Sequence, residues 1–288
     1  MKYILKIFSD FCDEKTSIKT MTDIAIHKLK NYGKNNEIYI TDKEDYTHVI
    51  IWNVAMPKLR EDITKDKVIG LAYEPLVYLR LTNAFVEYAK KYIGKYYIGD
   101  KRGLPEPFIE SNAYLIYNSP QASIPIKNKL MSIMVSQKND QPGHQYRHML
   151  VKNILHNRLP IDIYGRGCQY YKRSMDLSDS RIKGNFERYE MYDGYKFHIC
   201  IENVRSNHYF SEKIINTLLT NTTPIYLGCN NIDKYFPNDV INLSGDLRKD
   251  LEMIIHILQN PNDYIKQINV DEIENKVNLL KNLEILFN

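Results

Sequence analysis

Charged and polar side chains gather where a buried strand of the sequence gives way to a helix. The run 197–202 (FHICIE) is typical of a buried strand, and a helix is predicted over Ser211 to Asn221, with Glu212 and Lys213 in its first turn. Ser211 suits the N-cap, because its hydroxyl can accept a hydrogen bond from an unpaired backbone N–H. A lysine in the first turn opposes the helix dipole, so an anion such as phosphate would explain it. The alternative is that Glu212 and Lys213 are solvated charges beginning an amphipathic helix.

Two further charged side chains follow predicted strands. Arg147 lies near the start of the helix predicted over 145–157, after the strand 132–136. Its planar guanidinium suits a diphosphate better than a lysine would, which makes it a candidate second phosphate ligand. Glu74 follows the strand 67–73 and precedes a proline, a position that suits a general base at a strand end. The alternatives are a surface arginine and a solvated loop carboxylate.

Several known signatures are absent from the sequence. It contains no G-x-G-x-x-G, P-loop, H-E-x-x-H, G-x-S-x-G or kinase set, which argues against the usual dinucleotide, P-loop, zinc-protease and esterase functions. The histidines show no ligand spacing, and His198 within FHICIE is expected to be a hydrogen-bonded core residue. The four cysteines stand far apart, so we expect free thiols rather than a disulfide framework or a zinc site.

The elements that position these residues alternate between strands and helices. In the first half, strands are predicted at 1–9, 37–41, 47–52, 67–73 and 95–98, with helices at 17–31 and 82–92. In the second half, strands are predicted at 132–136, 161–164, 197–202, 224–227 and 240–243, and helices at 145–157, 211–221, 246–259 and 272–287. Prolines at 105, 107, 120 and 125 predict a linker or crossover between the halves.

This alternation predicts an α/β protein with two Rossmann-like domains facing one another across a cleft. We expect the domains to comprise residues 1–128 and 129–288, the second including the C-terminal helices. Ligands of such sheets bind at the carboxyl ends of the strands. The helix at 272–287 is expected to pack on the core, with a subunit contact as the alternative.

Composition limits the classes of partner. Lys plus Arg is 39 and Asp plus Glu is 35, and a formal charge of +4 over 288 residues is too weak a bias for a dedicated nucleic-acid protein. No apolar run approaches the ~18 residues that would span a bilayer, and the N-terminus has no signal-peptide pattern. We therefore expect a soluble protein of a reducing, cytoplasmic compartment.

The segment 195–228 (YKFHICIENVRSNHYFSEKIINTLLTNTTPIYLG) resembles the donor-binding signature of the α1,3/α1,4-fucosyltransferases, family 10 of the glycosyltransferases. The matching pieces are YKF, EN, Y-x-S-E-K and P-I-Y-x-G, in the order and spacing of the family. The strand SIMVS with its following arginine, IDIYGRG and GLAYEP resemble further family segments. The resemblance covers about 132–243 well and the first half thinly. The resemblance implies the GT-B fold. The chain is similar to the soluble bacterial or large-virus members of the family, which act on glycans in the bacterial or host cytosol.

The resemblance implies roles for the candidate residues. Arg147 and Lys213 would bind the diphosphate of GDP-fucose, and three residues would line the nucleotide site: Asn203, Tyr209 and Glu212. Glu74 would be the base that takes a proton from the hydroxyl of an oligosaccharide or glycoconjugate acceptor. The family inverts the anomeric carbon, and cations with the helix dipole at Ser211 would stabilise the leaving diphosphate, so no essential metal or other cofactor is expected.

Three residues depart from the family pattern. Val204 stands where the family usually has serine, His208 where glycine or aspartate is common, and Phe210 where a smaller aliphatic residue is common. If these line the donor loop, the sugar or base could differ from that of GDP-fucose. The alternatives are therefore a transferase of the same fold with another nucleotide sugar, and a catalytically idle relative that binds a glycan or nucleotide.

Overall fold

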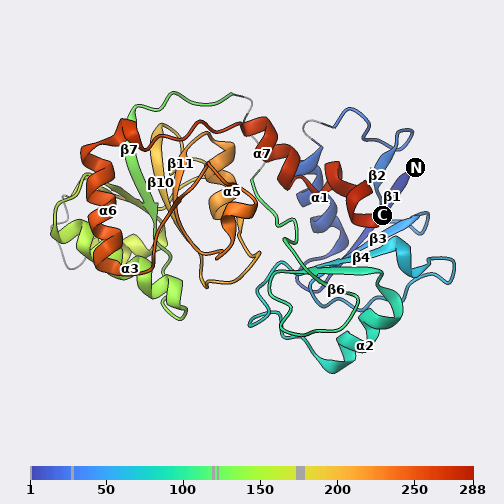
Figure 1. The fold of residues 1–288 in the computed structure, drawn as a ribbon. Coiled ribbons are helices and arrows are strands. Elements are labelled where there is room, and N and C mark those ends of the chain that lie inside the picture. The colour runs from blue at the N-terminus through green and yellow to red at the C-terminus, as the bar shows by residue number, and fades with distance from the viewer. Residues whose placement is uncertain (1, 27–28, 119–120, 122, 173–178) are drawn as a thin grey trace. The chain divides into compact units, whose positions relative to one another are not determined.

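The computed structural model of the protein describes residues 2–26, 29–118, 121, 123–172 and 179–288. Its chain contacts form two compact units (Figure 1). The first comprises Met1–Ser119, Ser206–Tyr209 and Glu274–Asn288, and the second comprises Pro120–Arg205 and Phe210–Ile273. Each unit contains one six-stranded sheet in which every described strand pairing is parallel. The predicted α/β class is confirmed.

The sheet of the first unit has the order β2-β1-β3-β4-β5-β6. Its strands are β1 (Tyr3–Ser9), β2 (Ile38–Ile40), β3 (His48–Trp52), β4 (Val68–Leu71), β5 (Lys95–Ile98) and β6 (Phe108–Glu110). Successive residues of a strand point to opposite faces, so Ile50 packs in one core and Val49 and Ile51 in another. The helices α1 (Glu14–Ala25) and α8 (Leu283–Phe287) contribute to the first of these cores and α2 (Asn83–Tyr92) to the second.

The sheet of the second unit has the order β12-β11-β10-β7-β8-β9. Its strands are β7 (Lys129–Met134), β8 (Asp162–Tyr164), β9 (Ile182–Gly184), β10 (Tyr195–Ile201), β11 (Thr223–Leu227) and β12 (Ile241–Asn242). Its helices are α3 (Pro142–His156), α4 (Gln169–Lys172), α5 (Glu212–Leu219) and α6 (Leu247–Gln259), and α7 (Val270–Val277) crosses the division between the units. Numbered within the unit, the strands follow the Rossmann order 3-2-1-4-5-6, which reverses between β7 and β10.

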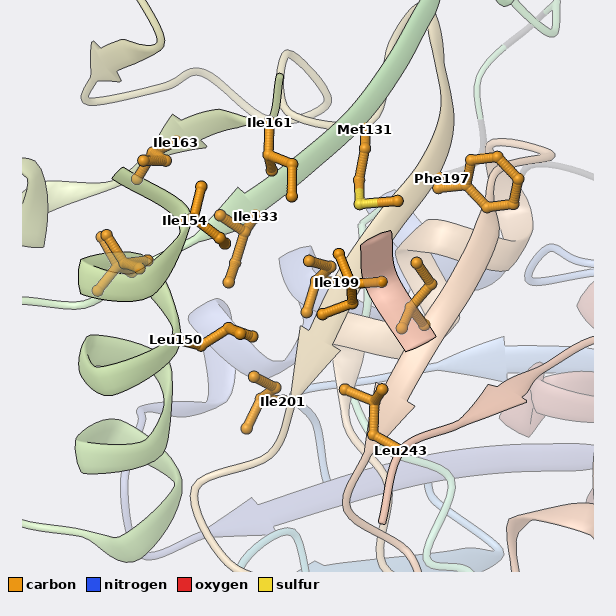
Figure 2. Packing of buried hydrophobic residues seen from close by; sticks show 14 of the residues in the cluster. Met131, Ile133, Leu150, Ile154, Ile161, Ile163, Phe197, Ile199, Ile201 and Leu243 are labelled. Atoms are coloured by element: carbon orange, nitrogen blue, oxygen red, sulfur yellow. The ribbon is translucent and has the colours of Figure 1, made fainter. Parts of the chain in front are cut away.

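One core of the second unit lies between its sheet and α3 (Figure 2). Leu150 and Ile154 of α3 pack in the same cluster as Ile133 of β7 and Ile199 of β10. All four side chains are almost wholly buried. Burial of this much apolar surface fixes where α3 begins relative to the carboxyl ends of β7 and β10.

The predictions for the proline-rich linker and for the bounds of the first helix are partly wrong, and two short elements were not predicted. The proline-rich segment contains β6, whose three residues pair with β5 and were too short to give a periodic signal; Pro120 lies outside the described residues. β9 and the short α4 were also not predicted. The first helix begins at Glu14 rather than Ser17, because the carboxylate of Asp13 caps it by accepting from the N–H of Thr16. That helix ends at Ala25, and residues 27–28 of the prediction lie outside the described residues.

The C-terminal segment differs from the prediction in two ways. The single helix expected over 272–287 is interrupted at Asn278, whose side-chain oxygen accepts from the N–H groups of Leu280 and Lys281 and caps a new turn. Residues 274–288 also belong to the first unit, not to the second. This segment belongs to the first unit because its apolar side chains Leu283 and Leu286 are buried in the core that includes β1, β3 and β4. Core packing of this segment was expected, and only its domain assignment was wrong.

Candidate functional site

Arg147 lies at the point where the second sheet reverses its strand order. It belongs to the second turn of α3, whose side chains lean toward the helix N-terminus. Its Nη2 donates to Oδ1 of Asn203 at 2.6 Å, and its Nε donates to the carbonyl of Gly143 at 3.2 Å. Because α3 follows β7 and Asn203 follows β10, this contact spans the two strands between which ligands of such sheets bind. The side chain is 2% exposed, so the alternative of a surface arginine is wrong.

A glycine lets α3 begin against the end of β10. The N–H of Gly143 donates to the carbonyl of Asn203 at 2.9 Å. A Cβ at residue 143 would lie 1.8 Å from the carbonyl oxygen of Glu202, so no other residue fits without moving one of the two segments. This close approach brings the guanidinium of Arg147 to Asn203.

Glu202 organises the start of α5. Its carboxylate is buried, and its Oε1 accepts from the backbone N–H of Ser211 at 2.8 Å. The hydroxyl of Ser211 donates to the same carboxylate, with Oε2 at 2.7 Å. Ser211 Oγ in turn accepts from the N–H of Lys213 at 3.4 Å, which confirms Ser211 as the N-cap of α5. Glu202 therefore fixes the helix end that the sequence marked as an anion site.

Lys213 lies between two carboxylates. Its Nζ is 3.3 Å from Oε2 of Glu202 and 3.1 Å from Oε1 of Glu212, and it donates to Ser211 Oγ at 3.0 Å. The side chain of Lys213 is mostly buried, whereas that of Glu212 is about half exposed. The alternative that both are ordinary solvated charges therefore fails for Lys213, which is held against the N-terminus of α5.

The protein environment shifts the pKa values of these groups. Desolvation lowers the pKa of Arg147 below its ordinary value, and the charges of Glu202 and Glu212 oppose that shift only in part. Desolvation also acts to lower the pKa of Lys213, but the two carboxylates outweigh it and the pKa is raised. For Glu212, desolvation acts upward, and the charge and hydrogen bond of Lys213 bring the net pKa below its ordinary value. The raised pKa of Lys213 and the lowered pKa of Glu212 favour their charged forms, and the guanidinium of Arg147 stays protonated as it does in proteins generally.

The structure therefore brings together five of the predicted site residues in the second unit: Arg147, Asn203, Ser211, Glu212 and Lys213. Sequence reasoning left out Glu202, which connects Lys213 to the helix cap. A signal for it was present, since it is the one charged residue in the run FHICIE and stands at the end of an otherwise buried strand.

The remaining two predicted residues belong to the first unit. Tyr209 is half-buried and packs beside Gly99, where a Cβ would lie 3.2 Å from the Cβ of the tyrosine. Glu74 is exposed and lies three residues after β4, near the carboxyl edge of the first sheet. The expected position of Glu74 at a strand end is thus confirmed, and its role as a base stays a prediction.

The three departures from the family pattern have different environments. Phe210 is buried, with its ring centroid 4.9 Å from that of Tyr235 and 5.3 Å from that of Phe236, so it serves the core and does not line a donor loop. His208 has a positive φ of 55° and its Nε2 lies 3.6 Å from Oε1 of Glu110 in the first unit. Val204 is half-buried. Only Val204 and His208 remain candidates to alter donor choice.

His198 has the structural role that was expected. It is buried, and its Nδ1 lies 2.8 Å from the hydroxyl of Ser132. Burial lowers its pKa to about 3, so it is neutral in the folded protein at physiological pH. The four cysteines are free thiols.

The described residues contain no group of three or more His, Cys, Asp or Glu side chains arranged to hold a metal ion. Nor do they include a helix long and apolar enough to cross a membrane.

Comparison with known proteins identifies the second half of the chain. Residues 124–266 match the family model described as glycosyltransferase family 10 (fucosyltransferase), C-terminal part. This region is a family 10 glycosyltransferase domain. It contains Arg147, Asn203, Lys213 and the rest of the cluster around Glu202, so the cluster belongs to the part of the chain that the family model describes.

Relatives by sequence are described as fucosyltransferases. A putative fucosyltransferase of Acanthamoeba polyphaga mimivirus is 28% identical over 111 residues, which are 36% of this chain and 18% of that protein. GDP-fucose protein O-fucosyltransferase 3 of Danio rerio is 27% identical over 166 residues, which are 55% of this chain and 36% of that protein. The chain thus matches about a third or less of the length of these relatives.

Solved structures share the fold. An α1,3-fucosyltransferase has a TM-score of 0.54 at 14% identity, covering 94% of this chain and 82% of that one. A glycosyltransferase from Rickettsia africae ESF-5 has a TM-score of 0.52 at 14% identity, covering 99% of this chain and 98% of that one. The predicted GT-B fold class is confirmed by these neighbours and by the two parallel sheets.

Proposed function

We propose that the protein transfers fucose from GDP-fucose to a hydroxyl group of a glycan, with inversion at the anomeric carbon. The observation that carries this proposal is the buried Arg147, whose side chain donates hydrogen bonds to three uncharged groups: the carbonyl of Gly143, Sδ of Met134 and Oδ1 of Asn203. Burying a cation without an anionic partner costs solvation free energy. A diphosphate bound at this edge of the sheet would offset that loss of solvation free energy through charge-assisted hydrogen bonds.

The second cation and the helix end support the same ligand. Lys213 lies at the N-terminus of α5, where backbone N–H groups and the helix dipole favour an anion. Growing negative charge on a departing diphosphate would be stabilised by Arg147, Lys213 and this dipole. These groups do the work that a metal ion does in other enzymes, so we propose transfer without an essential metal.

The donor is proposed to be GDP-fucose because the matching family model and the relatives are described by fucose transfer. Glu212, half exposed beside Lys213, would accept hydrogen bonds from ribose hydroxyls, and Asn203 and Tyr209 would complete the nucleotide site. Val204 and His208, which depart from the family pattern, are the positions where a different nucleotide sugar would be accommodated.

Glu74 is proposed as the catalytic base. The acceptor oxygen would attack the anomeric carbon opposite the bond to GDP, and Glu74 would take the hydroxyl proton as that bond forms. The sugar passes through a state of oxocarbenium character, as in glycoside hydrolysis. One displacement of this kind inverts the anomeric centre, which NMR of the product would show directly.

A thermal-shift titration against GDP, UDP, CMP, GDP-fucose and GDP-mannose tests the donor site. A ligand that binds only the folded state raises the melting temperature by mass action. Selective stabilisation by GDP and GDP-fucose, unchanged by EDTA, is the expected result. Stabilisation by UDP alone would overturn the donor, and a response to none of the ligands would favour an idle relative.

A further inference from the structure

We propose that Phe11 is the outer ring of an aromatic platform on which a pyranose of the acceptor stacks, next to Glu74. The platform consists of Phe11, Trp52 and Tyr73, all in the first unit. This inference rests on the proposed function, since it assigns the sugar that Glu74 would deprotonate. Beyond the proposed function, the inference names a carbohydrate-binding site in the first unit and a pyranose as its ligand.

The three rings come from neighbouring strands of the first sheet. Trp52 is the last residue of β3, Phe11 follows β1 by two residues, and Tyr73 follows β4 by two residues. The strand order β2-β1-β3 reverses its direction of growth between β1 and β3. Ligands of open parallel sheets bind outside the carboxyl ends of the strands at such a reversal. The platform therefore occupies the ligand-binding edge of the first unit.

Phe11 is presented as a flat, supported surface. Its ring is stacked on that of Trp52, with centroids 5.7 Å apart and planes only 6° from parallel. Trp52 is fully buried, whereas Phe11 is 49% exposed. Several large apolar side chains of the described residues are as exposed as Phe11, so exposure alone does not mark a site. Phe11 is distinguished by its place at a strand end and by its parallel stacking on a buried tryptophan.

The backbone around the platform is fixed by side-chain hydrogen bonds. The hydroxyl of Ser9 accepts from the N–H groups of both Phe11 and Cys12, at 3.2 and 3.3 Å. Oδ1 of Asn53 accepts from the N–H of Tyr73 at 2.8 Å and so ties the end of β3 to the end of β4. Asn53 itself has a positive φ of 52°. Residues held in this way present a preorganised surface, which lowers the entropic cost of binding.

Two buried polar atoms at the same place lack partners. Nε1 of Trp52 and the hydroxyl of Tyr73 are buried without a hydrogen bond among the described residues, although the two rings lie 5.0 Å apart. Unpaired buried donors are rare in native proteins because each one costs free energy. Both atoms are closed off from solvent, so a sugar on the outer face of Phe11 would not contact them, and the proposal rests on the stacked rings and on their place at the strand ends.

These features together favour a sugar as the ligand of the platform. The face of an aromatic ring is negative, and the C–H hydrogens on the apolar face of a pyranose are weakly positive, so the two surfaces attract one another while the sugar hydroxyls stay at the rim. No charged side chain belongs to the platform itself, which argues against a phosphate or a carboxylate as the stacked group. Glu74 directly follows Tyr73, so the platform and the proposed base belong to the same strand end of the first sheet.

Saturation-transfer NMR with methyl β-D-galactopyranoside and methyl β-D-glucopyranoside tests the platform without any turnover. We expect transfer to the ring C–H protons of at least one pyranoside in the wild type, and a Kd raised roughly tenfold by Phe11→Ala. Phe11→Trp should retain binding. The control is Tyr92→Ala, which removes another partly exposed ring of the first unit, paired with Tyr88 at 4.8 Å, and should leave the Kd unchanged.

The outcomes separate this inference from the proposed function. Absence of transfer from the wild type to both pyranosides, or wild-type affinity in Phe11→Ala, would overturn the platform. GDP binding, followed by thermal shift in the same variants, reports on the donor site alone and should not change with Phe11. If GDP stabilises the protein and the sugars do not bind, the platform fails and the donor proposal stands; the reverse result would leave a carbohydrate-binding unit with no donor site.

Discussion

Arg147 and Asn203 join the first turns of α3 to the end of β10 through a hydrogen bond of 2.6 Å between Nη2 and Oδ1. The bond lies at the reversal of strand order in a Rossmann sheet, so the buried guanidinium of Arg147 lies where ligands of such sheets bind. The charges of Glu202 and Glu212 offset the burial of this cation only in part, and its hydrogen bonds go to uncharged groups, so an anion bound here would stabilise it further.

Replacing Arg147 by alanine should therefore weaken GDP binding. The expected loss is roughly 1.5–3 kcal/mol, the value of one charge-assisted hydrogen bond, or about ten- to a hundredfold in Kd. Isothermal titration calorimetry with GDP measures it. Arg248→Ala removes an exposed arginine of α6 in the same unit and should leave the Kd unaltered. Equal GDP affinity in Arg147→Ala and wild type would remove this residue from the site.

Glu202 was not among the predicted site residues, but we expect its buried carboxylate to stabilise the folded protein. Glu202→Gln would remove the charge that pairs with Lys213 at 3.3 Å and weaken the carboxylate's contacts with Ser211, and we expect a loss of roughly 1.5–3 kcal/mol in unfolding free energy. Urea denaturation gives this value. Glu252→Gln is the matched control, because the exposed pair of Glu252 with Arg248 should contribute less than about 1 kcal/mol. Similar losses in both variants would contradict a special role for Glu202.

The sequence predicted most of the strands because parallel strands buried on both faces are nearly continuous apolar runs. FHICIE lies in β10 except for Glu202, although β10 already begins at Tyr195, and THVIIW lies in β3 except for Thr47. β6 and β9 could not be found in this way, since each has three residues and is defined by its pairing with a neighbour. Pairing partners distant in sequence leave no local period.

The cap of α5 at Ser211 was predicted from a local signal, and the omission of Glu202 from the predicted site has a physical cause. Ser211 and Lys213 carry a local signal, because helix caps and dipoles depend on residues a few positions apart. The depth of Arg147 depends on Gly143 and on the carbonyl of Glu202, which are brought together only by the sheet. The assignment of residues 274–288 to the first unit could not be predicted either, because it depends on the three-dimensional core in which their leucines are buried.

Glu74→Gln should separate binding from chemistry. The amide cannot accept the acceptor proton, so transfer should fall by about a hundred- to ten-thousandfold while GDP affinity is retained. Release of GDP in a coupled assay, with the same acceptor at saturation, measures the rate. Glu87→Gln changes an exposed carboxylate of α2 and should be fully active. Normal turnover by Glu74→Gln would refute its assignment as the base.

Stability should fall on mild acidification because His198 is buried without charge. Its pKa is about 3 in the folded protein through desolvation, against ~6.5 when unfolded, so the unfolded state alone takes up a proton between these values. The unfolded state then binds more protons, and stability decreases as pH falls through that window. At pH 5 the contribution is about 2 kcal/mol relative to pH 7.

Urea midpoints of wild type and His198→Gln between pH 7 and pH 5 would isolate this effect. The variant should be less stable at pH 7, since it disturbs the contact with Ser132, but it should lose less on acidification. His156→Gln, at an exposed position of α3, should keep the slope of the wild type. Parallel slopes for His198→Gln and wild type would show that another group is responsible.

The C-terminal helix should be an integral part of the first unit, and two neighbouring side chains of α8 test this. Leu283 is 2% exposed in the core with β1, β3 and β4, whereas Ile285 is 70% exposed. Leu283→Ala leaves a cavity as well as losing apolar burial, so we expect a cost of about 2–5 kcal/mol. Ile285→Ala removes a side chain of similar size from a surface already in water and should cost less than about 0.5 kcal/mol. Differential scanning calorimetry of both variants measures the contrast, and equal melting temperatures would mean that this segment does not complete the core.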